Sequence, residues 1–183
     1  SQISKILNTA SLLEKELKWH SASKQYNKAL KIDPSLTAAR IGLIRSGSKA
    51  ELKNKLNYII KNPMRLSNSN VFLEAQNTYK EAIKIQNPDE NLISQISKVK
   101  NILLLSKLPI NMEISSDDLT SVSIYRVGDI GHFTSKNMQL KPGEYTFVGS
   151  RSGYRDIRKV VTLIPGSTNN KIQVMCIEKV NNG

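Results

Sequence analysis

The sequence is poor in the residues that most often build cross-links or reactive sites. Its 183 residues include one cysteine, one tryptophan and two histidines. A single cysteine cannot form an intramolecular disulfide, and it argues against a cysteine-based metal site. Cys176 lies in an apolar stretch, so we predict that it is a small buried hydrophobe rather than a reactive thiol.

Long apolar runs and aromatic residues are also scarce. No run approaches the roughly 18 apolar residues that a membrane-spanning helix requires. Aromatic residues make up 5% of the chain, so the core must be mostly aliphatic. Hydrophobic residues reach 39% and charged residues 23%, a balance that predicts a folded chain rather than a disordered one.

The sequence also offers few candidate catalytic residues. His20 and His132 have no partner at a metal-ligand spacing. The segment Gly128–Gly131 is predicted to be a turn, because no strand–helix context makes it a dinucleotide fingerprint. We therefore expect no catalytic residues, no metal and no cofactor. A subunit of an enzyme remains a rival hypothesis.

The excess positive charge is concentrated in the first part of the chain. The net charge is +12: residues 1–108 hold 18 basic and 8 acidic residues, and residues 109–183 hold 9 and 7. A basic surface attracts nucleic acids, anionic lipids, acidic polymers or acidic proteins through its long-range field. The absence of interleaved aromatic residues argues against single-stranded nucleic acid.

The residue pattern changes near Pro109, which predicts an α+β chain of two domains, 1–108 and 109–183. Apolar residues recur at helical spacing before this point and alternate after it, and seven of the nine glycines follow it. The predicted helices are 3–15, 19–32, 36–45, 49–61, 70–85 and 87–107. The predicted strands are 121–127, 145–149, 160–164 and 172–177, separated by Pro- and Gly-containing turns that are typical of a small antiparallel β-sandwich or barrel.

Helix ends follow from local breakers. Asp33-Pro34 and Asn62-Pro63 end two of the helices, since the residue before proline is pushed out of helical geometry. Ser46-Gly47-Ser48 is predicted to break another. The last helix carries an apolar stripe that calls for a partner surface, and it suits packing against the rest of the chain better than a coiled coil of only two heptads.

Residues 19–34 resemble the second helix of a tetratricopeptide repeat. Ala22, Tyr26, Ala29 and Pro34 match that family's spacing. Small residues let two helices approach closely, an aromatic ring fills the gap, and proline ends the helix. The match is confined to this half-repeat. It implies stacked helices with a concave groove for a peptide or protein.

The second half resembles a PEGA domain, a small β-sandwich found in bacterial surface and envelope proteins. The resemblance lies in residues 140–148 (LKPGEYTFV), the pair Gly153-Tyr154 and residues 160–166 (VVTLIPG), although the literal Pro-Glu-Gly-Ala string is absent. Residues 122–128 and 149–156 look like a bacterial subgroup in which repeat helices precede the sandwich. The resemblance implies a position outside the cytoplasm, an anchor upstream of Ser1, and no catalytic residues.

Two groups of side chains are candidate partner-binding sites. The first group comprises Arg126, Arg151, Tyr154, Arg155 and Arg158. Arginine and tyrosine suit carboxylates, phosphates or sugars. The alternative is a structural turn in which Asp156 pairs with an arginine. The second group comprises Lys24, Lys28 and Lys31, which share one helical face. That face either docks an acidic partner or is simply solvated.

These observations predict a non-enzymatic scaffold or adaptor of the bacterial envelope that binds a protein or peptide. The alternatives are a binder of anionic polymer, whether nucleic acid or cell-wall glycan, through the basic half, and a glycan-binding role for the Arg/Tyr group.

Overall fold

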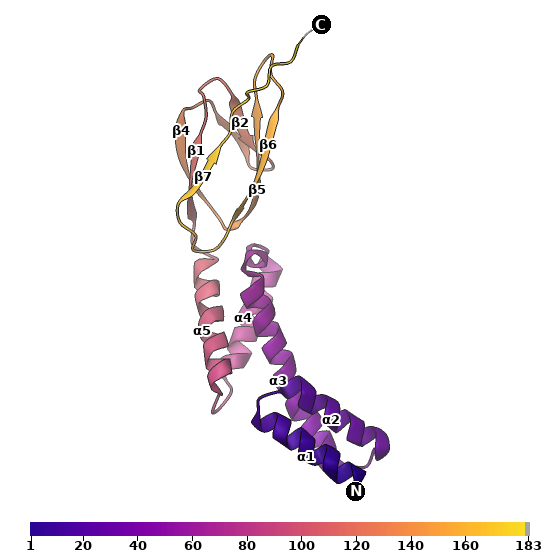
Figure 1. Cartoon of the computed structure of the whole chain (residues 1–183). Coiled ribbons are helices and arrows are strands. Elements are labelled where there is room, and N and C mark those ends of the chain that lie inside the picture. The colour runs from indigo at the N-terminus through magenta and orange to yellow at the C-terminus, as the bar shows by residue number, and fades with distance from the viewer. Residues whose placement is uncertain (182–183) are drawn as a thin grey trace. The chain divides into compact units, whose positions relative to one another are not determined.

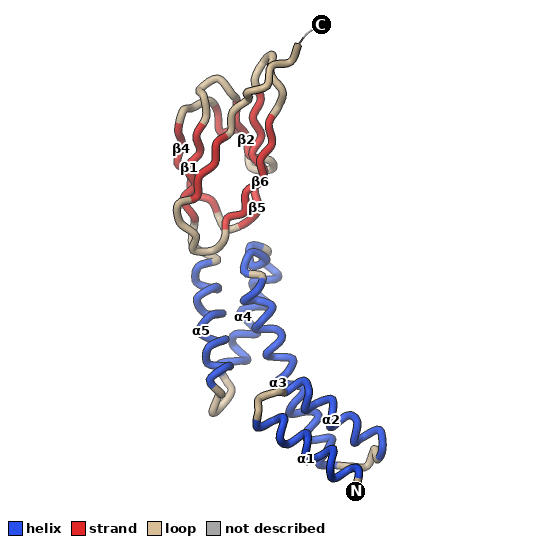
Figure 2. Tube along the Cα trace, in the orientation of Figure 1, coloured by secondary structure: helices blue, strands red, loops and turns tan. Residues whose placement is uncertain are grey.

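The computed structural model describes residues 1–181 and divides into two compact units. Unit 1 comprises residues 1–58 and 78–96, and unit 2 comprises residues 59–77 and 97–183. Helices precede strands along the chain (Figures 1 and 2), so the predicted α+β class is confirmed. The change from helix to strand falls between Leu105 and Ile110, whereas the compact units divide within helices.

Five α-helices and one short 3-10 helix lie within the described residues. They are α1 (Gln2–Lys15), α2 (Trp19–Ile32), α3 (Thr37–Lys61), η1 (Pro63–Ser67), α4 (Ser69–Ile83) and α5 (Glu90–Leu105). No helix in residues 1–181 is both long enough and apolar enough to cross a bilayer.

The predicted break at Ser46-Gly47-Ser48 is wrong, because α3 continues through it for 25 residues. The Ser46 side chain is fully buried, and its hydroxyl donates a 2.6 Å hydrogen bond to Glu14 Oε1 on α1. A glycine inside a helix costs only about 0.5–1 kcal/mol. This tertiary contact helps to offset that local preference, which a sequence pattern cannot show.

Small residues bring α1, α2 and α3 close together. Ala10, Ala22, Ala29 and Ala39 are completely buried in one cluster. Tyr26 belongs to the same cluster and its ring lies directly against the backbone of Gly42 on α3. The close approach and the aromatic filler follow the physical reasoning given for residues 19–34.

The second half forms two sheets. The strands are β1 (Ile110–Ser115), β2 (Ser121–Ile124), β3 (Gly128–Gly131), β4 (Ser135–Leu140), β5 (Gly143–Ser150), β6 (Ile157–Leu163) and β7 (Asn170–Gln173). One sheet has the order β4-β1-β7 and the other β3-β2-β5-β6. All pairings are antiparallel except β1 with β7, which is parallel.

The two sheets share one core, so the predicted sandwich is confirmed. Met112 and Ile114 of β1 lie in the same buried cluster as Ile124 of β2 and Phe147 of β5. Val174 and Cys176 follow β7 and are also buried, which confirms the prediction for the cysteine. Thr120 is buried as well, and its hydroxyl oxygen accepts the Cys176 amide at 3.1 Å.

Several strand predictions need correction. Strands β1 and β4 were not predicted, and Gly128–Gly131 is a strand rather than a turn. An irregularity in β2 between Val122 and Ser123 accompanies the pairing of this glycine-containing strand. The predicted strand 121–127 ends at Ile124. The predicted strand 172–177 ends at Gln173 as β7, and residues 174–181 after it form no strand, although Val174 and Cys176 are buried.

Candidate functional site

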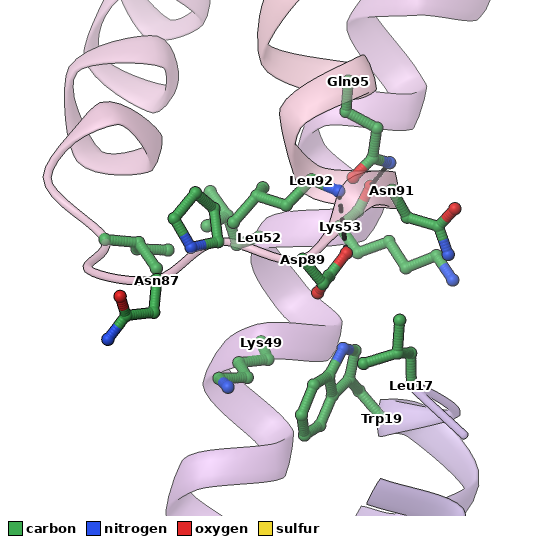
Figure 3. A pocket seen from close by; sticks show the side chains of 12 residues that line it. Leu17, Trp19, Lys49, Leu52, Lys53, Asn87, Asp89, Asn91, Leu92 and Gln95 are labelled. Carbon is green, nitrogen blue, oxygen red and sulfur yellow. Dashed lines mark hydrogen bonds between the residues drawn. The ribbon is translucent and has the colours of Figure 1, made fainter. Parts of the chain in front are cut away.

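Unit 1 contains a pocket of about 170 Å³ to which three separate segments contribute (Figure 3). They are the turn from α1 to α2, the middle of α3, and the loop and first turns of α5. The apolar lining consists of Leu17, Trp19, Leu52, Ile85, Pro88 and Leu92. The polar lining consists of Lys49, Lys53, Asn87, Asp89, Asn91 and Gln95.

Trp19 is the largest apolar side chain of the pocket and begins α2. Its indole lies between Lys49 and Leu17 (Figure 3). The Lys49 ammonium lies 4.1 Å from the centroid of the indole ring. Such a cation–π contact contributes about 0.5–1 kcal/mol at an exposed site, so it favours keeping the cation at the edge of the apolar surface.

A strained turn presents Leu17. The Leu17 amide donates to the carbonyl of Glu14, and the Lys18 amide donates to the carbonyl of Leu13. This pair of bonds closes the end of α1 in a Schellman motif, whose left-handed position is usually glycine. Leu17 occupies that position with φ of 59°. A non-glycine residue in this conformation costs on the order of 1 kcal/mol or more. The Leu17 side chain is therefore placed at the pocket at the cost of local backbone strain.

The loop between α4 and α5 is held by polar side chains. Asn87 adopts φ of 51°, a conformation that asparagine tolerates. Asp89 Oδ1 accepts the Leu92 amide at 2.9 Å and caps the start of α5. Gln95 Nε2 donates to Asn57 Oδ1 at 2.7 Å, which joins α5 to α3 beside the pocket. Hydrogen bonds therefore fix this wall of the pocket both at the start of α5 and at Gln95.

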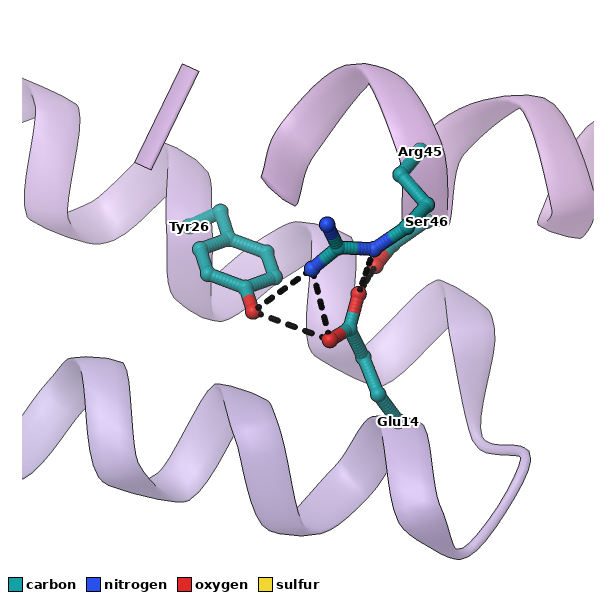
Figure 4. Close-up of polar contacts among 4 residues, drawn as sticks. All are labelled: Glu14, Tyr26, Arg45 and Ser46. Atoms are coloured by element: carbon teal, nitrogen blue, oxygen red, sulfur yellow. Dashed lines mark hydrogen bonds and ion pairs between the residues drawn. The ribbon is translucent and has the colours of Figure 1, made fainter. Parts of the chain in front are cut away.

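A polar cluster ties α1, α2 and α3 together one turn from the pocket (Figure 4). The Glu14 carboxylate accepts hydrogen bonds from Arg45 Nε at 3.0 Å and Arg45 Nη2 at 2.8 Å. It also accepts the Tyr26 hydroxyl at 3.1 Å and the Ser46 hydroxyl at 2.6 Å.

The electrostatics of Glu14 follow from these contacts. Burial alone would raise the pKa of its carboxyl, but the hydrogen bonds from Arg45, Ser46 and Tyr26 and the Arg45 charge outweigh it and lower the pKa. The pKa of the Tyr26 hydroxyl is raised by burial and by the Glu14 charge. Glu14 stands three residues before Leu17, and Arg45 stands one helical turn before Lys49. The cluster thus positions two walls of the pocket.

The size and lining of the pocket decide what it can hold. Sites for cofactors and small ligands usually enclose about 300–1,000 Å³. A space of about 170 Å³ suits one apolar side chain instead. The amide groups of Asn87 and Asn91 offer both donors and acceptors, which match those of a peptide backbone.

The structure places Lys24, Lys28 and Lys31 together on the exposed face of α2. None of them lines the pocket. The prediction of a shared helical face therefore holds in geometry, and the role of that face as a docking surface stays a prediction.

Part of the predicted arginine and tyrosine group is brought together in unit 2. The Arg151 guanidinium carbon lies 4.1 Å from the Tyr154 ring centroid, and Arg151 Nη1 lies 3.7 Å from Asp117 Oδ2. Arg155 pairs with Glu178 at 3.4 Å. Both cations already have carboxylate partners, which are not the expected Asp156. Backbone hydrogen bonds join the C-terminal segment to the 151–155 turn: the Arg155 amide donates to the Glu178 carbonyl, and the Val180 amide donates to the Gly153 carbonyl.

Of the other two arginines, Arg126 lies apart from this group. Ser121 of β2 pairs with Ser150 of β5, whereas Ile124 pairs with Phe147. Arg126 follows Ile124 in a turn, at the opposite end of β2 from Arg151. The expectation that Arg126 joins the group from a paired strand is therefore wrong. Arg158 is exposed on β6.

Unit 2 has a larger and shallower groove of about 470 Å³ beside β1 and the loop before β7. Its polar side chains are largely paired with one another. Gln139 Nε2 donates to Asn111 Oδ1 at 3.3 Å, and Lys171 lies 3.8 Å from Glu113. Groups that satisfy each other offer less to a ligand than the pocket of unit 1 does.

No three His, Cys, Asp or Glu side chains gather to hold a metal within residues 1–181. The pocket itself was missed by sequence reasoning. Trp19 was recognised only as a possible start of a helix, and the segments around it are separated by about 30 or more residues, so no local pattern assembles them. No protein-family model matches the chain, and no curated protein matches it.

Proposed function

We propose that this protein is a non-enzymatic interaction adaptor whose helical unit receives an apolar side chain of a partner protein in the Trp19 pocket. The observation that carries the proposal is the pocket itself: an indole and three leucines form walls that are half-buried rather than sealed. Binding energy at protein interfaces concentrates where one side chain fills such a pocket. The pocket volume of about 170 Å³ matches one apolar side chain.

Two further features support the proposal. Asn91 is exposed at the rim, where its amide can pair with the backbone that carries the anchor. Hydrogen bonds fix the pocket from α1, α3 and the start of α5, and a preformed site loses less entropy on binding than a mobile one.

The setting of this function is also a proposal. The resemblance of residues 109–178 to a PEGA domain supports a place in a bacterial envelope, with a helical module that binds and a sandwich that locates or spaces it. Fractionation of the cells that make the protein would test this. Recovery only in the cytosolic fraction would contradict it.

Site-specific photo-crosslinking tests the interaction itself. A benzophenone side chain replaces Asn91 at the rim or, as a matched control, Asn27, which is exposed on α2 and does not line the pocket. In the native cells we expect a discrete cross-linked species from position 91, lost when Trp19→Ala is added. A species of equal yield from position 27, or one that survives Trp19→Ala, would contradict the proposal.

A further inference from the structure

We infer that the segment entering the Trp19 pocket is acidic, with carboxylates next to its apolar anchor. This inference rests on the proposed function and narrows the class of partner. Lys49 and Lys53 stand on successive turns of α3 and both line the pocket. Neither forms an ion pair within the part of the chain that the structure describes.

The single acid of the lining, Asp89, offsets only one of these two positive charges. Asp89 Oδ1 is engaged with the Leu92 amide at the start of α5, where the helix dipole also favours a negative charge. Two ammonium groups against one carboxylate leave the lining with a net charge of +1 toward an incoming chain. A negative charge on the partner would complement this positive charge.

The position of Lys49 fixes where the negative charge of the partner must lie. Its ammonium lies 4.1 Å above the indole, so cation and apolar surface are adjacent. A partner that places an apolar side chain against Trp19 brings its neighbouring residues to Lys49 and Lys53. Aspartate or glutamate beside the anchor fits this arrangement, whereas lysine there would meet like charge.

The wider field favours the same class of partner. Unit 1 holds 13 basic and 7 acidic residues in its ranges 1–58 and 78–96, a net charge of +6. Such a field speeds the approach of acidic chains and repels basic ones. The local pair of lysines then decides where on the unit the acidic chain binds.

The single tryptophan of the chain gives a direct readout. Trp19 fluorescence would be excited selectively and recorded while peptides with both ends chemically blocked are added to the whole chain of 183 residues. The peptides carry a central phenylalanine flanked on both sides by aspartate, serine or lysine, and a leucine-centred set runs in parallel. We expect the aspartate peptides to bind about tenfold more tightly than the lysine peptides, with the serine peptides between them.

Charge variants locate the effect. An exposed ion pair contributes about 0.2–1 kcal/mol, so Lys49→Gln and Lys53→Gln should each weaken binding of the aspartate peptide up to about fivefold. Either variant should weaken binding of the serine peptide less than binding of the aspartate peptide. The matched control for the double variant Lys49→Gln with Lys53→Gln is Lys5→Gln with Lys80→Gln, which removes the same total charge from exposed positions outside the pocket. It should change the affinity little.

The outcomes separate this inference from the proposed function. Equal affinity for aspartate and serine peptides would overturn the acidic partner and leave the apolar anchor standing. An equal loss from the Lys5 and Lys80 variant would also overturn it, because the general field rather than the pocket would then act. If no peptide of either set changes Trp19 emission, both the inference and the anchor are wrong.

Discussion

At the scale of single residues, the Glu14 carboxylate is the centre of the polar cluster in unit 1. Its side chain is 14% exposed and accepts hydrogen bonds from three side chains on α2 and α3. Glu14→Gln keeps the shape but loses the charge that Arg45 faces. Loss of one partner from a buried polar group costs about 1–3 kcal/mol. We expect a decrease of that size in the free energy of unfolding, measured by urea denaturation.

The dependence on pH follows from the direction of the Glu14 shift. The folded-state pKa lies below the ordinary value of 4.5, so the ionised carboxylate stabilises the fold fully above that value. The contribution is lost as the pH falls through the folded-state pKa. The stability difference between wild type and Glu14→Gln should therefore shrink on acidification. A difference that stays constant down to strongly acid pH would contradict the assignment.

Leu17 links local strain to binding. Glycine in its place would relieve the left-handed backbone by on the order of 1 kcal/mol, against the loss of a half-buried leucine contact of similar size. We expect Leu17→Gly to leave the free energy of unfolding within about 1 kcal/mol of wild type. The affinity for the aspartate peptide should nevertheless fall. An unchanged affinity by Trp19 fluorescence would mean that Leu17 is no part of the site.

At the scale of elements, α3 offers a matched pair of glycines. A methyl group at Gly42 would overlap the Tyr26 ring, whereas one at Gly47 would have nothing within 4 Å. Alanine improves helix propensity by about 0.8–1 kcal/mol at either position, but overpacking costs about 1–3 kcal/mol. Gly47→Ala should therefore stabilise the protein, and Gly42→Ala should destabilise it. Thermal denaturation of both variants checks this, and the same sign for both would contradict the packing described here.

The elements that could be predicted are those with strong local signals. Residues 19–32 form α2 with the predicted bounds, because apolar spacing and the following Asp33-Pro34 define it. Strand β4 was missed because Lys136 interrupts its inward face. That ammonium donates to the Ile130 carbonyl at 2.9 Å, a contact that only the folded chain reveals. Strand β1 does alternate, and its Ile110, Met112 and Ile114 carried a signal that could have been recognised.

At the scale of the whole molecule, the charge distribution could be predicted from the sequence, whereas the pocket could not. The concentration of basic residues in the first half is a property of composition. The pocket depends on the α1–α2 turn, on α3 running unbroken past Gly47, and on the loop before α5. Because the sequence predicts a break in α3, it gives no reason to bring Trp19 and Lys49 together.

Mapping of peptide-induced shifts in the backbone amide NMR spectrum of the whole chain tests the central claim most directly. With the aspartate peptide, the largest changes should fall in residues 17–19, 49–53 and 85–95, and the amides of β1–β7 should stay unchanged. Changes that gather instead around Lys24, Lys28 and Lys31, or around Arg151 and Tyr154, would show that the partner binds elsewhere and would contradict the account.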